Sequence, residues 1–521
     1  MKRFTKTILS IVVILTLTLN YTVVFAAPPD KPSGEMSSSN GGIPPDKPSG
    51  EMSSSNGGTP PDKPDGNEGA PGGNNGSSNV SHTGATEISS DTTNNGQTYS
   101  SEAGSQNALL VTGGTSNISN PIVTKSGDSD GDNSDFYGTN AAVLVKEGTL
   151  NINGGNVTTN GSHANGVFAY SNGTINISDT NIKTSSNNSG AVMVTGGGTL
   201  TANNVTAETD GNSSAPIRSD RGGGTLTVNG GTYTSHGTGS PVIYSTADIT
   251  VNNANLTSTA SEGVVVEGKN SVTLNNVTME ATNTKLNGNS ETYKSIFIYQ
   301  SMSGDADVGT SSFTAKDSKI VNNKGEIIFV TNTSTVIELE NNEIINNDAD
   351  GGFLKIGAAK WGTSGSNGGN VTLNAKNQKI EGDILVDNIS TLDLSLKNGS
   401  SYAGAINGDN TAKTINITLD SSSGITLTGD SYITSLNNDV SDNSNINLNG
   451  HTLYVNGTAI TSTNYKGATV TTNENNDTAN IENTTQENSS IKTNIMIPIA
   501  IVIVIICVAL IVKKVSIKDN K

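Results

Sequence analysis

Large apolar residues recur every 23 to 26 positions through the middle of the chain, and this spacing limits what the chain can fold into. They are Leu150, Ile175, Leu200, Leu226, Ile249 and Val272. Within each unit, apolar and polar residues alternate, break at Gly, Asn or Asp, and resume, which predicts three short strands joined by tight turns. One unit cannot bury its own apolar side, but stacked units can. The repeat therefore predicts an all-β, parallel β-helix over residues 105–460.

The series extends beyond these six units. Phe313 and Ile337 continue it after an insertion at about 283–305, and the register loosens after Ala358. Alternating pairs such as Val371 and Leu373 still follow, so we expect the last coils there.

The composition agrees with a narrow solenoid interior. Only 4% of residues are aromatic and 15% are charged, while Gly is abundant at 59. So few large apolar residues would make a thin conventional core. The net charge of −18 argues against nucleic acid as a partner, because phosphate backbones are bound by Lys and Arg.

Both ends of the chain carry export and anchoring signals. Residues 1–26 have a basic start, a short apolar run and an Ala-rich exit, which predicts a signal peptide. Residues 27–104 begin with two near-identical copies of a 16-residue Pro-rich repeat and continue as Gly/Asn/Ser-rich sequence, so we expect a disordered tail.

The other end predicts a membrane anchor. Residues 461–494 are rich in Asn and Thr and read as a stalk. Residues 495–512 form an uncharged apolar run that is about long enough to span a bilayer. Lysines follow it in 513–521. The positive-inside rule places 513–521 in the cytoplasm as a tail, and the rest outside. We therefore expect a single-pass protein of the cell membrane with an extracellular ectodomain.

Several segments resemble a known family. The coil pattern resembles right-handed parallel β-helices of the pectate-lyase-like superfamily. Residues 136–142, 298–306, 361–369 and 419–436 are more closely similar to β-helix surface proteins of Gram-positive bacteria. The resemblance implies a right-handed β-helix, export and an adhesin-like role. It implies no reaction and therefore no catalytic residues.

One short run combines scarce arginines with a carboxylate. It holds Arg218, Asp220 and Arg221, and the expected register points the first two outward, with Glu267 further along the Asp220 row. Polysaccharide lyases and hydrolases need carboxylates close to a basic group. These three residues are the catalytic candidates, although a surface ion-pair cluster is the interpretation we prefer.

An outward row of unusual apolar character predicts a binding face. The row reads Leu144, Phe168, Met193, Arg218, Ile243, Val265 and Phe297, and the next row includes Tyr170, Asp220, Glu267 and Tyr299. Exposed apolar stripes often mark interaction sites, here for a glycan or a protein. The alternative is that a loop covers the stripe, such as the 283–305 insertion or the N-terminal tail.

An acidic loop is the candidate metal site. Residues 127–135 contain Asp128, Asp130, Asp132 and Asp135, and oxygen-rich loops of this kind bind Ca²⁺. The loop is not an EF-hand, because Asn133 stands where that motif needs Gly. A solvated acidic loop is the alternative, so the sequence establishes no cofactor and suggests Ca²⁺ alone.

Together these features predict a surface protein that binds a polysaccharide, or a host or cell-surface protein, without catalysis. The alternative is a surface polysaccharide lyase or hydrolase acting on an outer face of the β-helix.

Overall fold

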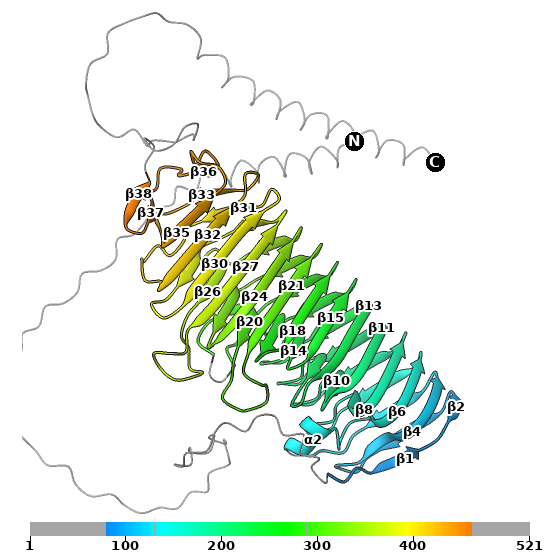
Figure 1. The fold of residues 1–521 in the computed structure, drawn as a ribbon. Helices are drawn as coiled ribbons and strands as arrows, with labels where there is room; N and C mark the ends of the chain where they lie inside the picture. Colours follow the sequence, from blue (N-terminus) through cyan, green and yellow to red (C-terminus); the bar gives the residue numbers. More distant parts are fainter. Residues whose placement is uncertain (1–79, 130, 288–289, 461–521) are drawn as a thin grey trace, which may run out of the picture. The chain divides into compact units, whose positions relative to one another are not determined.

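The computed structural model describes residues 80–129, 131–287 and 290–460, which form a right-handed parallel β-solenoid of about 15 turns (Figure 1). The predicted signal peptide, the Pro-rich repeats, the stalk, the 495–512 span and the 513–521 tail lie outside these residues. Within the described ranges, no helix combines the length and the apolar character that crossing a membrane requires.

Each coil contributes strands to three faces. The first face holds β1 (Gly84–Ile88), β10 (Val192–Thr195), β12 (Ile217–Ser219), β14 (Ile243–Ser245), β17 (Val264–Glu267), β20 (Lys294–Tyr299), β23 (Glu326–Thr331), β26 (Leu354–Ile356), β29 (Ile384–Val386) and the first parts of β4 (Asn107–Ser119), β6 (Val143–Asn153) and β8 (Val167–Ser178). The second face holds β2 (Thr92–Asn95), β15 (Asp248–Asn252), β18 (Ser271–Asn275), β21 (Thr310–Lys316), β24 (Thr333–Glu340), β27 (Gly369–Lys376), β30 (Thr391–Lys397), β32 (Thr414–Leu419), β35 (Ser435–Asn438), the ends of β4, β6 and β8, and the first parts of β11 (Gly198–Thr209) and β13 (Gly224–Ser235).

The third face completes the coil. It holds β3 (Thr98–Ser101), β5 (Ile122–Lys125), β7 (Asn156–Thr159), β9 (Asn181–Thr184), β16 (Asn255–Ser258), β19 (Thr278–Ala281), β22 (Lys319–Asn322), β25 (Glu343–Asn346), β28 (Lys379–Glu381), β31 (Ser401–Gly404), β33 (Gly424–Leu427), β36 (Ile446–Asn447) and the ends of β11 and β13. The last strands, β34 (Ser431–Ile433), β37 (Leu453–Val455) and β38 (Thr458–Ile460), form a small sheet whose final pair is antiparallel.

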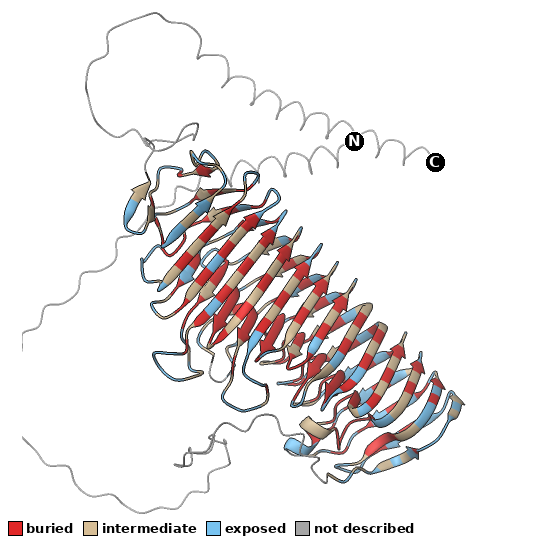
Figure 2. Cartoon of the chain, in the orientation of Figure 1, coloured by how far each residue is buried: buried red, intermediate tan, exposed pale blue. Residues whose placement is uncertain are grey.

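The repeat predicted from the sequence is the register of the second face. Leu150 pairs with Ile175, Ile175 with Leu200, and Leu200 with Leu226. The series continues through Ile249, Val272, Phe313 and Ile337. All eight side chains are at most 1% exposed, so they form one column of the interior. Figure 2 shows the same alternation of buried and less buried residues along the strands.

Asparagine ladders explain much of the polar composition. Asn204, Asn253, Asn276 and Asn341 all occupy turns with positive φ, a conformation that Asn tolerates well. Their amides bond to the equivalent turn of a neighbouring coil, as from Asn276 Nδ2 to Asn253 Oδ1 at 2.7 Å. Stacked turns therefore satisfy one another's side chains.

Two boundaries differ from the sequence prediction. The solenoid begins at β1, inside the segment assigned to the disordered tail, and β1, β2 and β3 form its first coil. In that coil Thr86 occupies the position where the next coil has Leu109, so the apolar repeat is weaker there in the sequence. The 283–305 insertion is not one loop, because β20 lies within it and pairs with β17.

Candidate functional site

The first face carries an outward row with one side chain per coil. The row runs Leu110, Leu144, Phe168, Met193, Arg218, Tyr244, Val265, Phe297 and Phe329. Tyr244 takes the place that the sequence prediction gave to Ile243, because Ile243 pairs with Ile217 on the inward side.

The predicted apolar stripe is not an open surface. Phe168 and Met193 are fully buried, and Phe297 is 4% exposed. The row divides into two covered clusters: Leu110, Leu144, Phe168 and Met193 pack with Ala141, while Val265, Phe297 and Phe329 pack with Trp361 and Ala359. This corrects the prediction of an exposed binding stripe, and the loop-covered alternative describes the row.

The cover over the first cluster comes from helix α2 (Asp132–Tyr137) and the residues after it. Gly138 ends the helix with φ of 72°, and a Cβ there would lie 2.8 Å from Leu144 Cδ1 and 3.0 Å from the Phe168 ring. Thr195 donates from Oγ1 to the Phe136 carbonyl at 2.6 Å, which ties the helix to β10. Neither predicted cover, the N-terminal tail or the 283–305 insertion, supplies this segment.

A pocket of about 290 Å³ opens where Arg218 interrupts the apolar row. Its lining includes Asp135, Phe136, Arg218, Asp220, Tyr244, Asn287, Tyr299 and Asp305. These residues come from α2, from the first face and from the loops on either side of β20. Figure 1 shows α2 and the loop after β20 on the same side of the coil stack.

Arg218 and Asp220 form the floor of this pocket. Nη2 of Arg218 donates to Oδ2 of Asp220 at 2.9 Å, and both side chains are almost completely buried. Burial raises the pKa of Asp220 to about 6, although the positive charge of Arg218 opposes the rise. Asp220 Oδ1 also accepts a hydrogen bond from the Arg221 amide at 3.0 Å.

Arg221 links the two sides of the pocket. Its guanidinium donates from Nε and Nη2 to Oδ1 of Asp305, at 3.0 and 2.6 Å. The same guanidinium lies 3.9 Å from the centre of the Phe136 ring, which is cation–π geometry. Arg221 therefore connects α2 to the loop that follows β20.

Glu267 lies behind the pocket and orients two of its phenols. It accepts hydrogen bonds from Tyr244 Oη at 2.5 Å and Tyr299 Oη at 2.8 Å, and a third from the Ser301 hydroxyl. Burial raises the pKa of both tyrosines well above the ordinary value, with the negative charge of Glu267 contributing. The phenols stay protonated and fixed in direction.

The carboxylates of the predicted calcium loop interact with different partners. Asp128 accepts the Ser162 amide at 2.7 Å, and Asp135 pairs with His163 Nδ1 at 3.0 Å. Among the described residues, no cluster of three or more possible metal ligands includes Asp128, Asp132 or Asp135. Asp130 lies outside the described residues. Asp135 instead contributes to the pocket.

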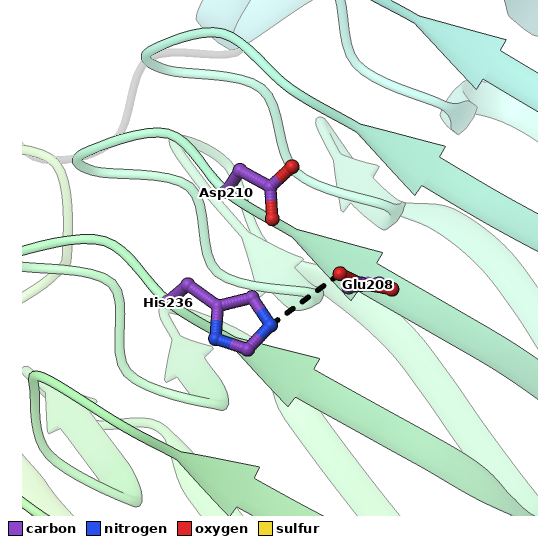
Figure 3. A group of neighbouring side chains, drawn as sticks. All are labelled: Glu208, Asp210 and His236. Atoms are coloured by element: carbon purple, nitrogen blue, oxygen red, sulfur yellow. Dashed lines mark ion pairs between the residues drawn. The ribbon is translucent and has the colours of Figure 1, made fainter.

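One other cluster has metal-ligand chemistry, that of Glu208, Asp210 and His236 (Figure 3). Their ligand atoms lie within 4.8 Å of one another, and His236 Nε2 is 3.4 Å from Glu208. The Lys183 ammonium, however, lies 2.9 Å from Glu208 and 3.2 Å from Asp210. A metal ion would have to displace this ammonium, so we do not assign the cluster as a metal centre.

The structure gathers some predicted site residues and separates others. Arg218, Asp220 and Tyr299 line one pocket and Glu267 supports it, whereas Phe168 and Met193 belong to the first covered cluster and Tyr170 packs against it. Sequence reasoning missed Tyr244 and Asp305, although Asp305 stood in a segment that the family resemblance had singled out. No family model, curated protein or solved structure matches this chain.

Proposed function

We propose that this protein binds carbohydrate, without catalysing a reaction, in the pocket between α2 and the loop after β20. The observation that carries the proposal is the convergence of fixed polar groups from three parts of the chain into one open pocket. Sugars are recognised by hydrogen-bonding groups whose directions are set before the ligand arrives. The ion pairs Arg218–Asp220 and Arg221–Asp305 set such directions here.

The size of the pocket favours a short stretch of glycan. About 290 Å³ is just below the usual range for ligand pockets, roughly 300–1,000 Å³. A chain end or a side branch fits that space better than a long internal segment. Phe136 adds an aromatic ring at the pocket wall, with Arg221 against one face.

Display at a cell surface completes the proposal. The sequence supports it with the signal peptide of 1–26 and the uncharged span of 495–512, both outside the described residues. A solenoid anchored behind its last coil would hold the pocket away from the membrane.

A glycan microarray probed with the detergent-solubilised full-length chain tests the proposal. We expect the wild type to bind a set of glycans and Asp305→Asn to bind them weakly. Asp307→Asn is the matched control, because Asp307 lies in the same loop but pairs with Lys269 at 2.8 Å, outside the pocket. Absence of glycan binding, or equal binding by Asp305→Asn and the wild type, would contradict the proposal.

Hydrolysis is a second candidate because of Asp220. Glycosidases pair a carboxyl group of raised pKa with an ionised carboxylate, and Asp220 has such a raised pKa with Asp305 nearby. Both oxygens of Asp220 are already engaged, by Arg218 and by the Arg221 amide, which is why we rank binding first. An assay for new reducing ends on every glycan that binds distinguishes the two.

A further inference from the structure

We infer that the pocket selects glycans that carry a free amino group, such as oligomers of glucosamine, over acidic glycans. The inference rests on the proposed function and names its ligand class. It follows from the charges around the pocket and from which of them are already neutralised.

Carboxylates outnumber cations around the pocket. The carboxylates are those of Asp135, Asp220, Glu267 and Asp305, and the cations are Arg218 and Arg221. Asp135 also pairs with the His163 imidazole. Each guanidinium is already paired with a carboxylate, at 2.9 and 2.6 Å. Among the described residues that line the pocket, none offers an unpaired positive charge to a uronate or a phosphate. An acidic ligand would therefore meet net repulsion.

Asp305 is the group most suited to receive an ammonium. Both hydrogen bonds from Arg221 go to Oδ1, which leaves Oδ2 without a donor among the described residues. The Asp305 side chain is 19% exposed at the pocket, so it is reachable and still partly shielded from water. An ammonium placed there makes a charge-assisted hydrogen bond, which is stronger than a neutral one.

The neighbouring groups suit the rest of such a sugar. Tyr244 and Tyr299 line the pocket and each gives its phenol proton to Glu267, so a sugar hydroxyl that reaches either oxygen must donate to it. Asn287 also lines the pocket, and its amide supplies both a donor and an acceptor. One amine and several hydroxyls thus find partners of matching polarity.

Isothermal titration of the full-length protein in detergent tests the inference with three tetrasaccharides: β-1,4-glucosamine, its fully N-acetylated form, and oligogalacturonate. We expect the free amine to bind about ten to a hundred times more tightly than its acetylated counterpart, as a charged hydrogen bond provides. We also expect added salt to shrink that preference, because exposed charges are screened.

The variants and the ligand set separate two kinds of failure. Asp305→Asn should abolish the preference for the amine, and Asp307→Asn should keep it. Equal affinity for the amine and its acetylated form, or tighter binding of oligogalacturonate, would overturn the inference and leave carbohydrate binding intact. Binding of none of the three, with a blank glycan array, would overturn the proposed function as well.

Discussion

Nη2 of Arg218 lies 2.9 Å from Oδ2 of Asp220, and the two side chains retain only 11% and 6% of their exposure. A buried pair of this kind gains little net free energy, because both charges have left water. Either charge buried without its partner would destabilise the fold much more. The pair therefore makes the pocket floor sensitive to single changes.

Arg218→Met should lower the free energy of unfolding by about 3–5 kcal/mol, because it leaves the Asp220 carboxylate buried without its partner. The double variant Arg218→Met/Asp220→Leu should recover most of that loss, since neither charge remains. Urea unfolding followed by circular dichroism measures both. A double variant as unstable as the single one would mean that the pair contributes more than mutual neutralisation.

The raised pKa of Asp220 predicts an unusual pH dependence. The group titrates near 6 in the fold and near 3.8 otherwise, so the folded state holds its proton more tightly. The free energy of unfolding should therefore fall as pH rises from about 4 to 6, by about 3 kcal/mol, and then level off. Urea midpoints of the wild type and Asp220→Asn, compared between pH 4 and 7, isolate this contribution; parallel curves would contradict it.

The covered apolar row should behave as core. Phe168→Ala should cost about 3–5 kcal/mol, as for other large-to-small changes at fully buried aromatic sites. Ile122→Ala is the control, because Ile122 is 49% exposed and should cost little. The urea unfolding midpoints of the two variants and the wild type measure both effects. If Phe168→Ala leaves the midpoint unchanged, the residue does not have the packed environment described here.

The Glu208, Asp210 and His236 cluster should bind Zn²⁺ only weakly in the wild type. The Lys183 ammonium already lies between the two carboxylates, and a metal ion would have to break both contacts. Lys183→Met should therefore raise the Zn²⁺ affinity, measured by titration calorimetry. Equal affinities of the two proteins would show that Lys183 does not compete for the site.

The repeat was predictable because interior positions obey one simple requirement. Most side chains in a column inside a solenoid are apolar, so Leu200 and Leu226 stand in register in the sequence as they do in the fold. The buried Ser116, one coil before Leu150 in the same column, is an exception. The first coil escaped prediction because the outermost coil covers less and can use Thr86 where the next has Leu109.

The site was predictable only in part. Arg218 and Asp220 were found because arginine is rare in this chain, which has it only at positions 3, 218 and 221. The polarity alternation led us to assign Ile243 to the outward row instead of Tyr244. A strand that is covered on both sides, such as β17 with its three consecutive valines, does not alternate in polarity. Asp305 could not be paired with Arg221 because the two are 84 residues apart and only the stacking of coils brings them together.

Hydrogen–deuterium exchange with and without a bound glycan tests the location of the site most directly. We expect bound ligand to slow exchange in 132–137, in 217–221 and in the loop that contains Asp305. Exchange in 357–368 should stay unchanged, although that loop covers the same face. Binding without protection in those three segments would contradict a ligand site between α2 and the loop after β20.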